Sequence, residues 1–126
     1  MNISKIHTND APEAIGPYSQ AVRVGDFVFT SGQIALVPES GSVEATDIAG
    51  QTEQVMKNLS AVLKAAGSSL EKAVKTTCFL VDMNDFATFN DIYGKYFTSK
   101  PARSCVAAKQ LPKNVLVEVE VIALAE

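Results

Sequence analysis

The sequence predicts a single α+β domain, with one mixed β-sheet that carries two helices on the same face. Strand-like runs outnumber helical ones, a strand separates the two helical segments, and turn residues are scattered singly without a linker. The chain has 126 residues, of which 47% are hydrophobic and 20% charged. A chain of this size can bury a core without disulfides or metal, so residues 1–126 are predicted to form one domain.

The N-terminal part is predicted to consist of strands. A short strand is expected near residues 3–7. Residues 21–24 and 27–31 are two β-prone runs joined by Gly25 and Asp26, a two-residue connection typical of a tight hairpin. Gly32 follows the second run directly. A glycine at a strand end often marks a bulge, or a place where another group comes close to the backbone.

A turn at residues 38–41 precedes the first predicted helix. Thr46 or Asp47 can cap this helix, which is expected to end near Ala66, and Gly67 suits the position just beyond its end. Its apolar residues recur at helical spacing, namely Ile48, Val55, Leu59, Val62, Leu63 and Ala66.

The second half is predicted to continue as strand, helix, strand, strand. Residues 73–81 are rich in β-branched and aromatic side chains and predict a strand. Asn84 or Asp85 can cap a helix that ends before Thr98. Strands are expected at residues 102–107 and 115–123, around a turn at 111–114. The helix carries one aromatic stripe that is predicted to be core, namely Phe86, Phe89, Tyr93, Tyr96 and Phe97. The predicted order is β-β-β-α-β-α-β-β.

The last strand has two different faces. The residues of one face are Val115, Val117, Val119 and Val121, and those of the other are Leu116, Glu118, Glu120 and Ile122. Neither face is cleanly polar. A sheet that is covered by helices on one side and partly apolar on the other would expose a large patch in a monomer. We therefore expect a homo-oligomer with a pocket where neighbouring copies meet.

Composition excludes several classes of function. The net charge is −3 and no cluster of Lys and Arg occurs, which argues against nucleic acid as a partner. No apolar stretch of signal-peptide or membrane-spanning kind is present, so a cytoplasmic protein without membrane contact is expected. The two cysteines are not in a C-x-x-C spacing, and the single histidine, His7, is interpreted as surface or strand decoration. Neither a His-rich metal site nor a cofactor is expected.

Arg103 is the first candidate for chemistry. It stands among small and apolar neighbours, where a guanidinium is costly to bury without a carboxylate or another anion. It either pairs with Glu118 or Glu120 inside an interface or presents its fork to the carboxylate of a substrate. The two glutamates share a strand face, roughly 7 Å apart between their Cα atoms. Each is half of an ion pair or a carboxyl group whose surroundings raise its pKa toward that of a general base.

Other candidates each have a plain alternative. Cys105 is a possible nucleophile, but no neighbouring His would lower its pKa, and a small buried cysteine is the commoner case. Cys78 lies in the middle of a predicted strand, so for this residue a buried structural role is favoured still more strongly. Tyr18 follows a Gly-Pro corner, where its hydroxyl could project into a cleft or simply pack on a loop. Ser31 and Gly32 match neither a phosphate-binding loop nor a nucleophile elbow.

Taken together, five segments strongly resemble the Rid (YjgF-like) family of reactive-imine deaminases. The most specific is the run Pro-Ala-Arg-Ser-Cys-Val with the Val-Glu-Val downstream of it. The resemblance covers the whole chain, with the segments in the same order and at similar spacings. The segments are residues 16–20, 30–33, 84–90, 101–106 and 117–119.

The resemblance implies a chorismate-mutase-like fold, assembled as a homotrimer with clefts between subunits. It also implies a cofactor-free reaction, the hydrolysis of 2-iminobutanoate or 2-iminopropanoate to a 2-oxo acid and ammonia. These imines are released by PLP-dependent threonine and serine dehydratases. Carried over by position, Arg103 is expected to hold the carboxylate of the substrate and Glu118 to position or activate water. The residues expected to line the pocket are Tyr18, Ser31, Gly32, Asn90 and Cys105.

Two other functions remain as alternatives. One is a non-catalytic or regulatory trimer that binds small carboxylates, and the other is an RNA-cleaving or translation-inhibiting activity. Two departures from the family pattern bear on pocket access and substrate size. The segment between Phe97 and Pro101 is shorter than in many relatives, and Val119 stands where a larger residue is more usual.

Overall fold

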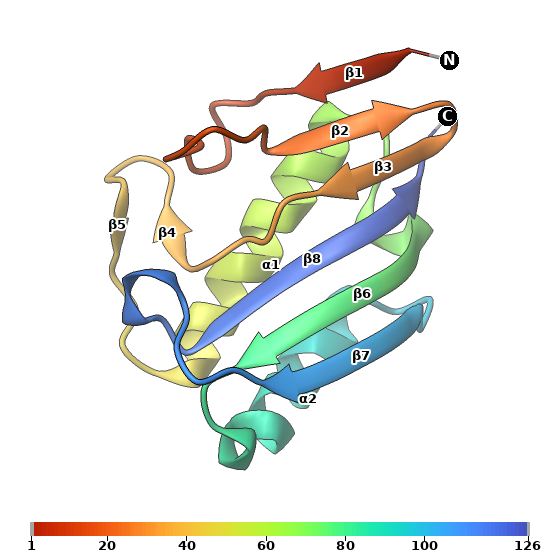
Figure 1. Ribbon diagram of the computed structural model, residues 1–126. Helices are drawn as coiled ribbons and strands as arrows, with labels where there is room; N and C mark the ends of the chain where they lie inside the picture. Colours follow the sequence, from red (N-terminus) through yellow and green to blue (C-terminus); the bar gives the residue numbers. More distant parts are fainter. Residues whose placement is uncertain (1, 126) are drawn as a thin grey trace.

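The computed structural model describes residues 2–125 and folds them into a six-stranded mixed sheet with two α-helices behind it (Figure 1). The strands lie in the order β1-β2-β3-β8-β6-β7, and all neighbours are antiparallel except β6 and β7, which α2 connects. The predicted fold class is confirmed, and the predicted order holds for the strands of the main sheet and the two helices, with one additional small hairpin between β3 and α1. The bounds are β1 (Ile3–Ile6), β2 (Ala21–Val24), β3 (Phe27–Thr30), α1 (Ile48–Ala65), β6 (Ala73–Leu80), α2 (Phe86–Tyr96), β7 (Ala102–Ala107) and β8 (Val117–Leu124).

Helix α1 begins and ends as its sequence predicts. Of the two candidate caps, Asp47 is the one used, and its side chain accepts a hydrogen bond of 2.9 Å from the backbone N–H of Gly50. Gly67 follows the helix with a φ of 80°, in the left-handed region. This conformation lets the N–H of Ser68 donate to the carbonyl of Leu63 at 2.8 Å and closes the last turn.

Helix α2 starts differently from the prediction. Asp85 occupies the N-cap position, but its side chain makes no capping hydrogen bond. Asp82 acts instead, accepting from the N–H of Asn84 at 2.8 Å at the start of a short 3-10 helix, Met83–Asp85. The 3-10 helix runs directly into α2, so Asp85 already has helical backbone angles. A side-chain cap needs an extended backbone, and only Asp82 has one.

Strand β8 supplies the centre of the core. Its residues Val117, Val119, Val121 and Ala123 are at most 1% exposed, and α1 packs against this strand. The alternation predicted from the sequence is therefore confirmed over the strand proper. The prediction that the strand includes Val115 is wrong, because a short 3-10 helix, Pro112–Asn114, has Val115 as its C-cap and the strand begins at Val117. The Val115 side chain belongs to a second, smaller cluster. That cluster is formed by Ile34, Leu36, Leu111 and Val115.

A two-stranded hairpin that the sequence did not predict stands beside the main sheet. It consists of β4 (Leu36–Val37) and β5 (Ser42–Val43), and the predicted turn at 38–41 joins them. Asn58 of α1 anchors it, because its side-chain amide donates to the carbonyls of Ile34 and Leu36 at 3.1 and 2.9 Å. Two-residue strands carry too little periodicity to be recognised in a sequence.

The predicted aromatic stripe of α2 is core in part. Phe89, Tyr93 and Phe97 are buried, whereas Phe86 and Tyr96 are half-buried at the edges of the stripe. Tyr96 donates its hydroxyl proton to the carboxylate of Glu53 and so ties α2 to α1. The outer edge of the stripe is therefore partly polar.

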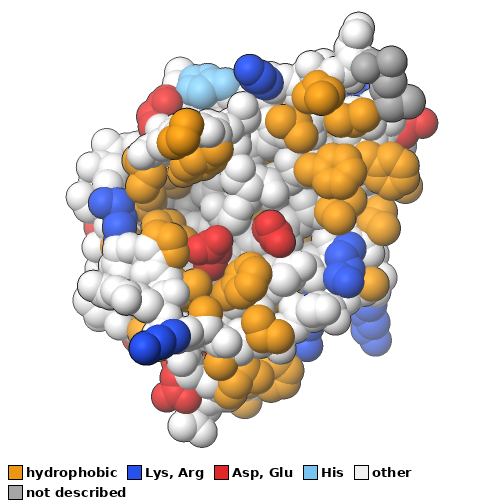
Figure 2. All heavy atoms as spheres, in the orientation of Figure 1, with side chains coloured by type: hydrophobic (Ala, Val, Ile, Leu, Met, Phe, Trp, Pro, Cys, Tyr) orange, Lys and Arg blue, Asp and Glu red, His pale blue; other side chains and the backbone are white. Residues whose placement is uncertain are grey.

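The face of the sheet opposite the helices is open and partly apolar, as the sequence predicted. Phe27 and Phe29 of β3 are cross-strand partners of Leu124 and Ile122 of β8. Both Phe rings and Leu124 are more than two-fifths exposed. Figure 2 shows hydrophobic side chains gathered over this face around a hollow at its centre. Within residues 2–125, no helix has the length and apolar character needed to cross a membrane.

Asp47→Ala should lower the free energy of unfolding by about 1 kcal/mol, because the first turn of α1 loses the acceptor for one of its N–H groups. Asp47→Asn retains an acceptor and should stay within about 0.5 kcal/mol of the wild type. Thr46→Ala, at the other candidate position, is the matched control and should also change little. Urea unfolding at a fixed protein concentration measures all three, and a larger loss for Thr46→Ala would contradict the assignment of the cap.

Candidate active site

A β-bulge forms where β3 leaves β8. Phe29 pairs with Ile122 and Gln33 with Val119, so four steps along one chain segment face three along the other. Gly32 is one of the three residues that lie between these two pairs and face only two residues of β8. The prediction that this glycine marks a bulge or a close approach is therefore confirmed, and the next contact shows that it marks both.

Gly32 makes room for the carboxylate of Glu118. A Cβ atom at position 32 would lie 2.1 Å from Oε2 and 2.9 Å from Cδ of Glu118. Glu118 is half-buried, and this burial raises the pKa of its carboxyl group, with the negative charge of Glu120 raising it further. Glu118 therefore binds a proton at a higher pH than an ordinary surface glutamate.

Glu118 lies in a cavity of about 560 Å³ on the open face of the sheet. The hollow in Figure 2 shows acidic side chains at its floor. Three other predicted site residues line it, namely Tyr18, Ser31 and Gly32. The structure thus brings together four of the seven predicted residues.

Two of these residues already have partners in their own loops. The Tyr18 ring is 47% exposed beside the cavity, and its hydroxyl accepts a hydrogen bond of 3.3 Å from the N–H of Ile15. The interpretation that Tyr18 packs on its loop is therefore confirmed; the residue also lines the cavity, but its hydroxyl is bound to the backbone of its own loop. The hydroxyl of Ser31 donates to the carbonyl of Ser19 at 2.6 Å, which leaves only its oxygen lone pairs for a ligand.

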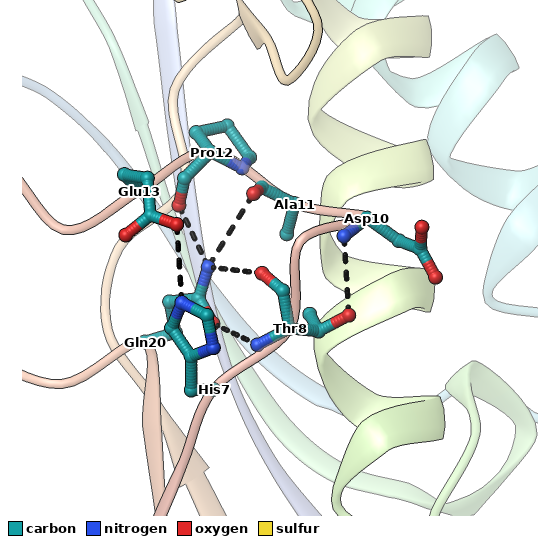
Figure 3. Close-up of polar contacts among 7 residues, drawn as sticks. All are labelled: His7, Thr8, Asp10, Ala11, Pro12, Glu13 and Gln20. Atoms are coloured by element: carbon teal, nitrogen blue, oxygen red, sulfur yellow. Dashed lines mark hydrogen bonds and ion pairs between the residues drawn. The ribbon is translucent and has the colours of Figure 1, made fainter.

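Sequence reasoning missed Gln20, which holds one wall of the cavity. Its side chain is 2% exposed and binds the segment that precedes the cavity lining (Figure 3). The amide donates to the carbonyls of Thr8 and Pro12 at 3.0 and 2.8 Å, while its oxygen accepts from the N–H of Thr8 at 2.7 Å. A weaker contact of 3.4 Å reaches Ala11. The only sequence signal was a polar residue just before a β-prone run.

His7 lies outside the cavity, at the surface. Its Nε2 is 3.1 Å from Oε1 of Glu13, and both side chains are largely exposed (Figure 3). The interpretation of His7 as surface decoration is therefore confirmed. Among residues 2–125, no group of three or more His, Cys, Asp or Glu is arranged to hold a metal ion.

Arg103 belongs to a second group of residues on the helix side of the sheet. Its Cα partner in β6 is Thr76, which is fully buried. The guanidinium carbon lies 4.8 Å from the ring centre of Tyr93 and 5.4 Å from that of Phe86. Nη1 donates a hydrogen bond of 2.7 Å to Oδ1 of Asn90. Three side chains of α2 thus hold the guanidinium in position.

The sheet separates Arg103 from Glu118 within one chain. Glu118 pairs with Phe79 of β6, and residues at this parity point away from the helices, whereas Arg103 points toward them. In the part of the chain that the structure describes, Arg103 forms no ion pair with a carboxylate. Arg103 therefore does not pair with Glu118 or Glu120 of its own chain, and the alternative that it pairs with one of them inside an interface stays a prediction. The predicted site consists of two groups that one copy does not bring together.

Cys105 lies beside Arg103 on the same face of β7 and is half-buried. Burial raises the pKa of its thiol, and the opposing effect of the Arg103 charge is smaller. Burial raises the pKa of Cys78, its partner across the strands, to about 12. Both cysteines are therefore thiols at neutral pH, which supports the structural interpretation over the nucleophile.

Comparison with known proteins agrees with this architecture. The family model described as Endoribonuclease L-PSP matches residues 8–125. A RutC family protein of Pyrococcus horikoshii is 51% identical over 122 residues, which cover 96% of this chain and 97% of that protein. A protein of Escherichia coli K12 named 2-iminobutanoate/2-iminopropanoate deaminase is 48% identical over 123 residues, covering 94% of this chain and 95% of that one.

Solved structures extend the likeness to the fold. The crystal structure of Escherichia coli TdcF with bound serine has a TM-score of 0.92 against this chain at 43% identity, and the match covers 98% of this chain and 99% of the other. The sequence match and the fold match both span nearly the whole chain. The chain therefore belongs to the Endoribonuclease L-PSP family, the Rid (YjgF-like) family that its sequence segments resemble.

Proposed function

We propose that this protein hydrolyses 2-imino acids, such as 2-iminobutanoate and 2-iminopropanoate, to 2-oxo acids and ammonia. One observation carries the proposal. Arg103 has a guanidinium fixed by α2 without a carboxylate partner in the described chain, while Glu118 has a raised pKa in a cavity on the opposite face. A cationic clamp and a carboxylate base are the two groups that this reaction needs.

The two groups meet in a cleft between copies of the chain. The open face carries exposed apolar residues beside the Glu118 cavity, and a soluble protein rarely leaves such a surface uncovered. Covering it with the β7 edge of a second copy would bring that copy's Arg103 toward the cavity of the first. A closed ring of three such contacts is the homotrimer expected from the family resemblance.

The reaction follows from the properties of these side chains. The substrate carboxylate binds the N–H groups of Arg103, which sets the adjacent C=N carbon over the Glu118 cavity. Glu118 takes a proton from a water molecule as the water oxygen bonds to this carbon and the C=N electron pair moves to nitrogen. The proton returns to nitrogen and gives a neutral carbinolamine. Glu118 then moves the hydroxyl proton to the amino nitrogen, and the C–N bond breaks, so that ammonia leaves and the 2-oxo acid forms. Orientation and one base suffice, because an imine carbon is already electrophilic.

The substrate must come from reactions that release free imines. PLP-dependent threonine and serine dehydratases form 2-iminobutanoate and 2-iminopropanoate, and we place this protein downstream of them in the cytoplasm. Both cysteines are free thiols, which agrees with a reducing compartment.

RNA cleavage is the second candidate, favoured by the name of the family model. The cavity argues against it, because its charged lining residues are Glu13, Glu118 and Glu120, and no Lys or Arg lies among the described residues that line it. Such a surface repels a phosphate backbone. A binding protein without turnover would show affinity for 2-oxobutanoate in calorimetry but no effect on imine hydrolysis.

Complementation between two inactive variants tests the shared cleft. Arg103→Ala and Glu118→Gln should each lower turnover of imine by about 10² or more, because each removes the clamp or the base. Assemblies formed from an equal mixture of both variants should regain activity, with about a quarter of the clefts in a cyclic trimer intact. The rate is measured as 2-oxobutanoate formed from threonine in the presence of a dehydratase.

A double variant that carries both substitutions is the control, since mixing it with either single variant restores no cleft. Activity that stays absent in the mixed assemblies, while both single variants form the wild-type oligomer, would show that Arg103 and Glu118 do not act in a shared site. If the wild-type protein does not increase the rate of 2-oxobutanoate formation, the proposed reaction itself is wrong.

Gly32→Ala should lower turnover by about tenfold or more with little effect on folding. The added Cβ would collide with the flexible end of Glu118 and move the carboxylate away from its position. Gly94→Ala is the matched control, because a Cβ there meets nothing within 4 Å on an exposed helix position. Thermal unfolding and the imine assay are measured for both, and full activity in Gly32→Ala would contradict the role of the Glu118 position.

The fall of kcat/KM at acid pH should follow the protonation of Glu118. Its base form is lost as the pH falls through its pKa, and the raised pKa places this loss at a higher pH than for an ordinary glutamate. Glu120→Gln removes a neighbouring negative charge, lowers the pKa of Glu118 and should move this fall to lower pH. Glu71→Gln, an equal change of charge at an exposed site outside the cavity, should leave it in place. The measurement is kcat/KM against pH, corrected for uncatalysed hydrolysis.

A further inference from the structure

We infer that Tyr93, held by the buried hydroxyl of Thr76, is a positioning residue that fixes the plane of the Arg103 guanidinium for a substrate carboxylate. The inference deepens the proposed function and rests on it. It assigns to Tyr93 and Thr76, neither of which was among the predicted site residues, the task of orienting the clamp.

The position of the Tyr93 ring is strongly constrained. Its hydroxyl lies 2.7 Å from Oγ1 of Thr76, which is 0% exposed, and Tyr93 itself is 7% exposed. The ring stacks on Phe97 with centres 4.6 Å apart and an angle of 30°, and it lies 5.5 Å from the ring of Phe89. A hydrogen bond at one end and rings on its flanks leave little freedom to rotate.

This fixed ring supports the guanidinium. Phe86, Asn90 and Tyr93 follow one another at intervals of four and three residues, so they share one face of α2. The Arg103 guanidinium lies across that face, 4.8 Å from Tyr93 and 5.4 Å from Phe86, with Nη1 bound to Asn90 at 2.7 Å. Within residues 2–125, the guanidinium makes no other hydrogen bond, so the Nε and Nη2 donors remain for a ligand.

Backbone pairing couples the support to the clamp. Thr76 of β6 is the Cα partner of Arg103 in β7, so the residue that holds Tyr93 is also the cross-strand neighbour of the arginine. Arginine has a long flexible side chain, and a fixed guanidinium loses less freedom on binding a ligand. The Tyr93 hydroxyl is engaged with Thr76 inside the protein, and therefore Tyr93 acts through Arg103.

Binding of two matched ligands distinguishes positioning from mere structure. Calorimetry gives the Kd of 2-oxobutanoate and of its neutral amide, 2-oxobutanamide, for the wild type and each variant. Wild-type protein should prefer the carboxylate. Tyr93→Leu removes the aromatic face and should reduce this preference about tenfold, with the amide Kd unchanged. KM should rise more than kcat falls, because the clamp contacts the carboxylate in both the substrate and the transition state, while looser orientation of the C=N carbon affects kcat as well.

Two milder variants test the role of the Thr76–Tyr93 hydrogen bond. They also test the inference if Tyr93→Leu does not fold. Tyr93→Phe and Thr76→Val each remove one side of the 2.7 Å hydrogen bond, and each should reduce the carboxylate preference about threefold. In the Tyr93→Leu background, Thr76→Val should have no further effect on the preference, because Thr76 acts through Tyr93.

The contrary outcomes separate the inference from the proposed function. An unchanged carboxylate preference in all variants, or an equal loss of affinity for both ligands, would overturn the positioning role and leave the deaminase proposal standing. If the wild-type protein binds the amide as tightly as the carboxylate, Arg103 does not recognise the substrate carboxylate. That result would contradict both the inference and the proposed mechanism.

Discussion

Strand β8 places its side chains alternately on two faces, and this alternation fixes where both the core and the cavity lie. Val117, Val119 and Val121 pack toward α1, so Glu118 and Glu120 must point to the open face. A shift of pairing by one residue would bury both carboxylates and expose the valines, which makes the register strongly specified. The bulge beside Gly32 adds one residue on the neighbouring segment and leaves room for Glu118 without disturbing this register.

The sheet also separates the Arg103 guanidinium from the Glu118 carboxyl group. Arg103 lies on the helix side, against α2, and Glu118 lies in the cavity on the other side. If both faced the same side of one chain, an ion pair would lower the pKa of Glu118 and occupy the guanidinium. Separation leaves the carboxylate with a raised pKa and the guanidinium with free donors. In our proposal, assembly unites them only where a substrate can enter between them.

The uncovered face thus connects stability with the proposed activity. Its exposed apolar residues, among them Phe27, Phe29 and Leu124, favour association with another copy. The same association would complete the cleft, since the Glu118 cavity opens on this face. On the other side of the sheet, the Thr76–Tyr93 hydrogen bond belongs both to the core and to the support of Arg103. Residues that stabilise this fold therefore also prepare its site.

The sequence by itself determined the elements whose signals are local. Helical spacing, a cap at Thr46 or Asp47, the glycine at 67 and the alternation of β8 each depend on neighbouring residues, and the structure agrees with them and selects Asp47 as the cap. The resemblance supplied the candidate site residues. Tertiary structure alone decided which side of the sheet each of them faces. The residues of β7 are small or mixed, so their period of two indicates no buried side, and only the parallel pairing with β6 turns Arg103 toward α2. The role of Gln20 and the small β4–β5 hairpin likewise depend on partners distant in sequence, which no local pattern encodes.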